Sequence, residues 1–169
     1  DELNDNPVWE RGEISICGEL ALGGDYTLTK SVKFLGTTND TDAAPKLTLG
    51  DGHGFTIPDD TEISVECHGL NIEKDGLDSF VIVGADESLV FRAVNCNIVR
   101  TQTSGAVSAD HAFLNVVTRG LLSAEFIACE IDMSAGSGSD DRPSFIRSTS
   151  KRYAKAAFIG CRITSDGDF

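Results

Sequence analysis

The chain has 169 residues, a length that suits one domain, and 40% of them are hydrophobic, which is enough for a continuous core. Its 27 acidic and 14 basic side chains leave a net charge of −13, which argues against nucleic acid and anionic membrane surfaces as partners. No window of about twenty apolar residues occurs, so the sequence predicts no transmembrane span.

Residues 1–20 are expected to form an N-terminal cap segment. They open on a polar stretch with neither an initiator Met nor a signal-peptide pattern, which predicts a processed end and is compatible with a lipid anchor upstream of residue 1. Val8 and Trp9 can cover the open end of a coil of strands, which would otherwise expose its core and its strand edges. Residues 21–169 are then expected to form the coil itself.

Short alternating runs follow, bounded by Gly, Asp, Asn and Ser, and they predict strands and turns throughout. Helix signals are scarce. The runs in the first half of the chain are Glu13–Cys17, Tyr26–Leu28, Val32–Phe34, Lys46–Leu49 and Glu62–Cys67.

The C-terminal half repeats one pattern three times. Each copy reads as a strand and ends in a Cys-x-Ile signature, which recurs after 33 and then 32 residues. The copies are Leu89–Ile98, Leu122–Ile131 and Ala154–Ile163, with a weaker one at Leu70–Ile72. A repeat of this length is typical of a solenoid, in which each turn adds one residue to each internal stack.

A second series runs in step with the first, because four phenylalanines follow one another after 25, 33 and 32 residues. At the strand spacing of about 4.8 Å, equivalent residues of successive turns would lie on one another. The sequence therefore predicts three internal stacks, with Ala93, Phe126 and Phe158, preceded by Cys67, at a further equivalent position. The stacks are Phe55, Phe80, Phe113 and Phe145; Cys96, Cys129 and Cys161; and Ile72, Ile98, Ile131 and Ile163.

The chain has five cysteines, an odd number, so at least one cannot pair within it. Side chains stacked in register on parallel strands point the same way and form disulfides poorly, so we expect free, buried thiols. No Cys-x-x-Cys occurs, and His53, His68 and His111 do not cluster with cysteines at zinc-ligand spacing. A zinc site is therefore not expected.

The segment Gly23–Gly36 combines a Gly-x-Tyr-x-Leu strand with a second strand that ends in Gly. Together with the two repeats, it resembles the pectate-lyase-like superfamily of right-handed parallel β-helix proteins. The likeness extends over residues 13–169 and is greatest to small modules on secreted and surface lipoproteins of polysaccharide-degrading gut bacteria. We expect an all-β, single-stranded right-handed parallel β-helix of about five or six turns, in a protein that is secreted or on the bacterial surface. A β-sandwich is the alternative that short strands and frequent turns also permit.

A turn of 32 or 33 residues is longer than three short strands need, so the excess is expected to leave the coil as loops. The loops fall at Glu73–Asp78, Val99–His111 and Asp132–Pro143, always between an Ile of one series and a Phe of the other. They should therefore lie side by side at one corner. Loops displayed on a rigid scaffold are where function is expected.

Candidate ligand-binding residues lie in the last two loops: Asp110 and His111, then Asp140, Asp141 and Arg142. The resemblance implies that acidic residues can hold calcium while a basic residue takes the proton α to a uronate carboxylate. Asp140 and Asp141 can supply some of the six to eight oxygen ligands that calcium needs. The base would be Arg142 or Arg147. The alternative is a polar turn with a local Asp–Arg pair, so no catalytic residue is assigned and no cofactor is required beyond this calcium candidate.

A glycoside hydrolase would need two carboxylates, for which Glu66, Glu125 and Glu130 are candidates. Glu125 and Glu130 are expected on one strand, facing opposite sides unless a bulge intervenes near Ala128–Cys129. No pairing among the three follows from spacing alone.

Tyr153 stands between Arg152 and Lys155, where a rim aromatic beside two cations can contact an acidic glycan. An ordinary surface tyrosine is the alternative. The chain ends at Phe169, 24 residues after Phe145, where a new turn would begin. This end predicts either further turns in the natural protein or a partner bound to the open end of the coil.

The function favoured by these observations is a non-catalytic secreted or cell-surface module that binds polysaccharide, or that displays loops toward polysaccharide or a surface protein. One alternative is a calcium-dependent polysaccharide lyase or another carbohydrate-active enzyme. The other is a structural or interaction module of a surface assembly.

Overall fold

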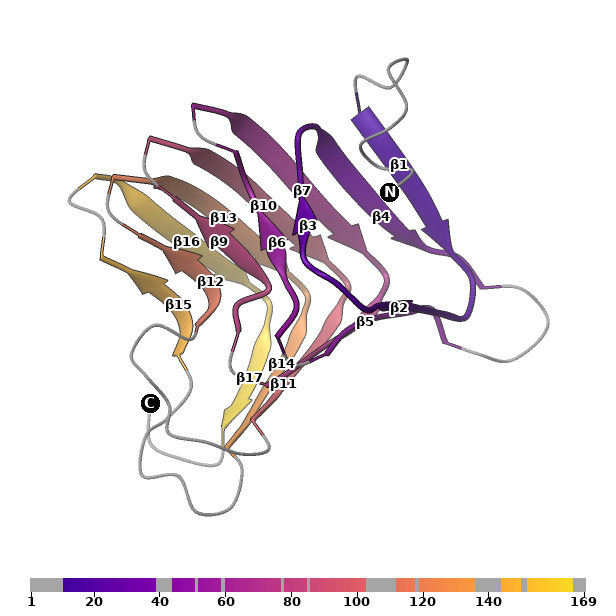
Figure 1. The fold of residues 1–169 in the computed structure, drawn as a ribbon. Helices are drawn as coiled ribbons and strands as arrows, with labels where there is room; N and C mark the ends of the chain where they lie inside the picture. Colours follow the sequence, from indigo (N-terminus) through magenta and orange to yellow (C-terminus); the bar gives the residue numbers. More distant parts are fainter. Residues whose placement is uncertain are drawn as a thin grey trace.

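The computed structural model describes residues 11–38, 44–50, 52–58, 60–76, 78–84, 86–102, 112–117, 119–135, 144–149 and 152–165. Every regular element in these residues is a β-strand, and the strands form three parallel sheets around one core (Figure 1).

Sheet A holds β1 (Arg11–Ile16), β4 (Ser31–Gly36), β7 (Glu62–His68), β10 (Ser88–Val94), β13 (Leu121–Ile127) and β16 (Ala154–Ile159). Sheet B holds β2 (Glu19–Leu22), β5 (Lys46–Leu49), β8 (Asn71–Asp75), β11 (Asn97–Gln102), β14 (Glu130–Ala135) and β17 (Arg162–Ser165). Sheet C holds β3 (Tyr26–Thr27), β6 (Phe55–Thr56), β9 (Val81–Val83), β12 (Ala112–Val116) and β15 (Ser144–Ser148).

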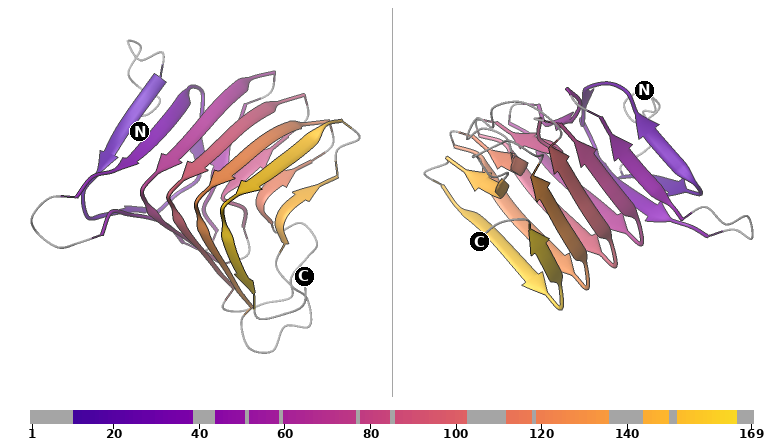
Figure 2. Two further views of the ribbon diagram at one scale, coloured as in Figure 1. Left: turned by 180° about the vertical axis from the view of Figure 1, so that it is seen from behind. Right: turned by 90° about the horizontal axis from the view of Figure 1, so that it is seen from below.

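The chain visits the sheets in the fixed order A, B, C and then returns to A one strand further along (Figure 2). Each strand pairs in parallel with its equivalent in the neighbouring turn, which is the connectivity of a single-stranded parallel β-helix. Six strands in sheets A and B and five in sheet C confirm the predicted five or six turns. Such parallel crossovers are right-handed in nearly all proteins.

The first turn starts inside the segment that the sequence suggests as a cap. β1 pairs with β4, and β2 pairs with β5, so residues from Arg11 onward already belong to the coil. Val8 and Trp9 lie outside the described residues, and their predicted role as a cap stays a prediction.

The corner between sheets A and B is a turn of two residues in the last four turns. Its first residue has positive φ each time: Gly69 at 62°, Asn95 at 52°, Ala128 at 51° and Gly160 at 64°. The expectation that Glu125 and Glu130 share one bulged strand is therefore wrong. The chain leaves β13 at Ala128 and enters β14 in another sheet, because the left-handed residue turns the backbone sharply.

The predicted phenylalanine stack is present in the core. Phe80 and Phe113 lie with ring centroids 4.7 Å apart and planes 11° from parallel, and Phe145 stacks on Phe113 at 5.0 Å. Phe55 meets Phe80 edge-on at 5.4 Å. Phe55, Phe80 and Phe113 are fully buried, whereas Phe145 in the last strand of sheet C is half-buried. A further parallel pair, Phe126 and Phe158 at 5.0 Å, confirms the second predicted aromatic position.

The isoleucine stack is also confirmed, because β8, β11, β14 and β17 pair with their isoleucines in register. Immediately before these strands lies the cysteine column. The Sγ atoms of Cys96, Cys129 and Cys161 donate hydrogen bonds to carbonyl oxygens of the preceding turn, at Cys67 (3.3 Å), Ala93 (3.5 Å) and Phe126 (3.3 Å).

All five cysteines are free, as predicted, but they differ in burial. Cys67, Cys96 and Cys129 are buried, Cys161 of the predicted column is only half-buried because it lies in the last turn, and Cys17, which is not part of the column, is exposed at the first A–B corner. Burial raises the pKa of the Cys67 thiol far above its ordinary value, which leaves it protonated at neutral pH.

We expect a thiol titration to separate these classes. Cys17 should react at once with Ellman's reagent in the native protein and Cys161 more slowly, while the three buried thiols should react only after denaturation, because the reagent needs an accessible thiolate. Five thiols should be counted in denaturant. Rapid reaction of more than two thiols in the folded protein would contradict the buried column.

We expect Ala128→Gly to stabilise the fold by about 0.5–1 kcal/mol, because a non-glycine residue is strained in the left-handed region. Gly160→Ala is the matched reverse change: it has the same conformation one turn later, and a Cβ there meets no atom within 4 Å. It should destabilise by a similar amount, as measured by urea unfolding. A lower free energy of unfolding for Ala128→Gly than for the wild type would show that backbone strain at Ala128 does not determine the effect of the substitution.

Candidate functional site

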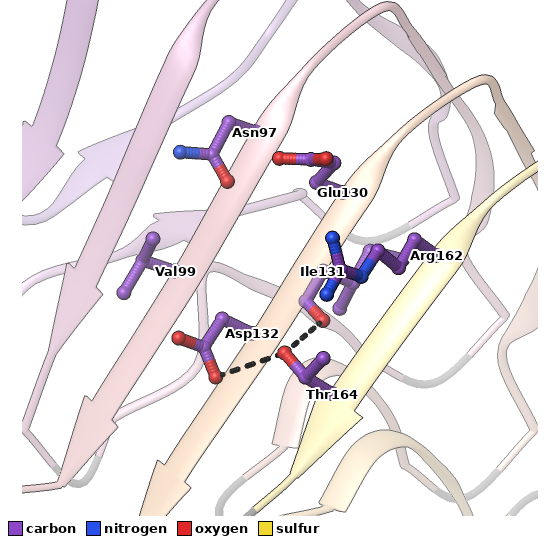
Figure 3. A pocket seen from close by; sticks show the side chains of 7 residues that line it. All are labelled: Asn97, Val99, Glu130, Ile131, Asp132, Arg162 and Thr164. Carbon is purple, nitrogen blue, oxygen red and sulfur yellow. Dashed lines mark hydrogen bonds between the residues drawn. The ribbon is translucent and has the colours of Figure 1, made fainter.

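A shallow groove of about 210 Å³ lies on the outer face of sheet B, across β11, β14 and β17 (Figure 3). Two rows of side chains cross these three strands in register. The first row is Asn97, Glu130 and Arg162, and the second is Val99, Asp132 and Thr164, with Ile131 completing the lining.

Strand alternation explains why this face is polar. The isoleucines of the Cys-x-Ile signature point into the core, so the residue between Cys and Ile must point outward. That residue is Asn97, Glu130 or Arg162 in the three successive copies. The signature therefore contains a signal for the first row, while Asp132 and Thr164 follow two residues later on the same face.

In the second row, the hydroxyl group of Thr164 forms hydrogen bonds that connect β17 to β14. Its Oγ1 lies 3.3 Å from Asp132 Oδ1 and 3.4 Å from the backbone oxygen of Ile131, and it is the hydrogen-bond donor to these oxygens (Figure 3). Glu130 and Arg162 are neighbours in register, yet no ion pair joins them among the described residues. The groove thus offers two carboxylates, an amide and a guanidinium to solvent.

The outer face of sheet A is different, because its charges neutralise one another. One row across this sheet alternates in sign in register: Glu13, Lys33, Glu66, Arg92 and Glu125. Lys33 pairs with Glu13 at 3.5 Å, and Arg92 with Glu125 at 2.9 Å. A second hollow of about 230 Å³ on this face is lined by Glu13, Lys33 and Glu66. Each of these charged groups already has a partner, because Lys33 pairs with Glu13 and Glu66 contacts His68.

The other end of sheet B also carries internal ion pairs. Lys46 Nζ lies 2.7 Å from Glu73 and 3.5 Å from Glu19. The hydrogen bond to Glu73 raises the pKa of Lys46 above its ordinary value. In the groove at β11, β14 and β17, by comparison, Glu130 and Arg162 lie side by side and neither forms an ion pair with another described residue, so we take it as the candidate site.

The chemistry available in the groove is hydrogen bonding. Glu130 and Asp132 lie on the same face of β14 with Cα atoms about 7 Å apart, since a strand rises about 3.3 Å per residue. The described residues contain no group of three or more His, Cys, Asp or Glu side chains that could hold a metal ion. Two carboxylates fall well short of the six to eight oxygen ligands of calcium.

Of the candidate ligand-binding residues predicted from the sequence, the structure describes Tyr153 alone. Asp110, His111, Asp140, Asp141 and Arg142 lie outside the described residues. They belong to the connections from β11 to β12 and from β14 to β15, both of which run from sheet B to sheet C. The three expected loops therefore do leave at one corner, although their first residues, such as Val99 and Asp132, are still in strands.

Tyr153 lies on a different corner, in the connection from β15 in sheet C to β16 in sheet A. Its relative exposure is 63%, so it is free to meet a ligand, but it is not part of the B–C corner. Its neighbour Arg152 and Arg119 of the preceding turn both pair with Asp86, at 3.3 and 2.6 Å.

The three carboxylates considered for a hydrolase are likewise separated. Glu66 and Glu125 lie on the outer face of sheet A, in one row with Arg92 between them, and Glu66 contacts His68 at 3.2 Å. Glu130 lies across the A–B corner on sheet B. Arg147, the alternative base, is on β15 of sheet C.

The described residues contain no helix with the length and apolar character needed to cross a membrane. Comparison of the chain with protein-family models, curated proteins and solved structures gave no match in any of the three.

Proposed function

We propose that the protein is a non-catalytic, secreted or cell-surface bacterial module that binds polysaccharide along the outer face of sheet B. The observation that carries this proposal is the groove whose Asn97, Glu130, Asp132 and Arg162 are not paired with one another. Sugar hydroxyls both donate and accept hydrogen bonds, so a face with donors and acceptors at strand spacing suits a chain of sugars.

The repeat pattern supports the same proposal through the resemblance to the pectate-lyase-like superfamily and to β-helix modules of polysaccharide-degrading gut bacteria. A lipid anchor upstream of residue 1 would fit this setting. Fold likeness alone does not assign a function, so the proposal depends on the groove.

The charges of the groove favour a neutral polymer over a uronate. Two of its side chains are carboxylates, and the whole chain carries −13, so an anionic polymer would be repelled over most of the surface. None of the seven lining residues is aromatic, so binding would depend on hydrogen bonds rather than ring stacking.

A polysaccharide lyase is the second candidate, because Glu130, Asp132 and Arg162 place acidic and basic groups on neighbouring strand faces. The predicted base, Arg142 or Arg147, and the predicted calcium ligands Asp140 and Asp141 are not among the residues of this groove. A structural or interaction role in a surface assembly is the third.

The test is native electrophoresis through gels that contain single polysaccharides, with and without calcium. We expect retarded migration in a gel of a neutral polymer, with no cleared zone. Arg162→Gln and Glu130→Gln should each reduce the retardation. The dissociation constant derived from the dependence of migration on polymer concentration should rise about tenfold or more, because each change removes one hydrogen bond to a charged group.

Arg92→Gln is the matched control, because it removes an exposed arginine from the outer face of sheet A and should leave the retardation unchanged. Equal retardation of Arg162→Gln and the wild type would contradict the groove as the binding site. A cleared zone that requires calcium would replace the proposal with the lyase. Unchanged migration in every gel would count against both and favour the surface-assembly role.

A further inference from the structure

One inward-facing column of sheet B contains two positive charges. It runs in register through Leu49, Lys74, Arg100 and Met133 on β5, β8, β11 and β14. Lys74 and Arg100 are fully buried, like the leucine below them. The turns on either side show that an apolar side chain fits this position, so packing by itself does not explain the two charges.

Lys74 is held by backbone oxygens at the B–C corner. Its Nζ donates to the carbonyl oxygen of Gly50 at 3.0 Å and to that of Asp75 at 2.5 Å. Oδ1 of the Asp75 carboxylate accepts hydrogen bonds from the Gly76 amide and the Thr101 hydroxyl. Lys74 therefore ties the connection after β5 to the end of β8 while keeping its charge inside the coil.

Arg100 has no such partners. Its Nε, Nη1 and Nη2 atoms are all buried, and none has a hydrogen-bond partner among the described residues. Burial lowers the pKa of Arg100 to about 10, opposed by the carboxylate of Asp78, so the guanidinium remains charged at neutral pH. A buried charge without hydrogen bonds is costly, and a guanidinium has five donors to satisfy.

Another unsatisfied group lies in the same corner. His53, in the connection from β5 to β6, has a buried Nδ1 with no hydrogen-bond partner in the described residues. Asp78 stands near this connection, because a Cβ built on Gly52 would lie 4.0 Å from its Oδ2. Thus Lys74 and His53 both lie beside Gly50, and Asp78, close to the same connection, is the carboxylate that acts on Arg100.

We infer that the B–C corner binds a small oxyanion, a carboxylate or a phosphate, on the guanidinium of Arg100. Arginine binds both groups through two parallel hydrogen bonds, which would satisfy donors that the described residues leave open. Lys74, one strand away, adds a second positive charge to the site. Because Arg100 is fully buried, the ligand has to be a small ion or the charged tip of a larger molecule.

The alternative is that the charges only support the fold. Replacing buried charges by apolar side chains of similar size is often neutral or stabilising. Apolar residues at these two positions would therefore support the fold equally well, and stability alone does not account for the charges. Met133 occupies the next position of the column, which makes Arg100→Met a substitution that the coil should accommodate.

The test is thermal unfolding of the whole chain after dialysis into HEPES, at constant ionic strength, with inorganic phosphate or acetate added in steps. We expect a saturable rise in Tm of about 5 °C with one of the two anions, since a ligand that binds only the folded state stabilises it. The more effective anion identifies the ligand class. Arg100→Met should abolish the rise, and Lys74→Met should reduce it.

Arg92→Met is the control, because it removes an exposed cation of sheet A and should keep the full response. An equal rise in Arg100→Met and the wild type would identify a general salt effect and overturn the inference. If neither anion raises the Tm, and native mass spectrometry of the purified protein detects no retained oxyanion, Arg100 is satisfied by water or by the chain itself, and the inference is wrong.

Discussion

Pairing of equivalent residues in register between successive turns is the constraint on which the rest of this structure depends. The isoleucines of β8, β11, β14 and β17 pair in register. This register also fixes which residue lies beside each of the other side chains on these four strands. Stacks of like residues then follow: Phe80, Phe113 and Phe145 place their rings nearly parallel because their backbones are one strand spacing apart. A shift by one residue would turn these side chains to solvent, so the buried stacks in turn hold the register.

The same pairing organises the charges outside the coil. In sheet A a residue of one sign meets the opposite sign in the next turn, as Lys33 does with Glu13 and Arg92 with Glu125. Such exposed pairs contribute little stability each, but they prevent like charges from lying at strand spacing. In the last turns of sheet B the side chains along the row are not paired, and this difference between two faces of one coil distinguishes the candidate site from ordinary surface.

Inside the coil the pairing also brings charges together. Lys74 and Arg100 are adjacent only because β8 and β11 pair with this register. Two cations stacked in a core would repel strongly; backbone oxygens hold Lys74, and the carboxylate of Asp78 favours the charged form of Arg100. The inward face of sheet B, in the residues that the structure describes, is therefore apolar apart from this charged pair near the B–C corner, the corner from which the long connections leave.

The sequence by itself determined the stacks. Their members recur at intervals that match one turn of the coil, so the spacing of cysteine, isoleucine and phenylalanine was enough to predict a parallel β-helix and most of its core. It did not reveal the corner at Ala128, because only the backbone conformation distinguishes a left-handed turn between two sheets from a bulge in one strand.

Tertiary structure alone decided which polar residues form pairs. The Cys-x-Ile spacing places Asn97, Glu130 and Arg162 in one outward row, but it does not show that these side chains form no ion pair with one another. The separation of Tyr153 from the B–C corner and the burial of Arg100 beside Lys74 likewise depend on which sheet each strand joins. Apolar stacks repeat the same residue, so the sequence shows both their positions and their chemistry, whereas a polar site combines different residues at the repeated positions, and its pairing follows only from the side-chain geometry.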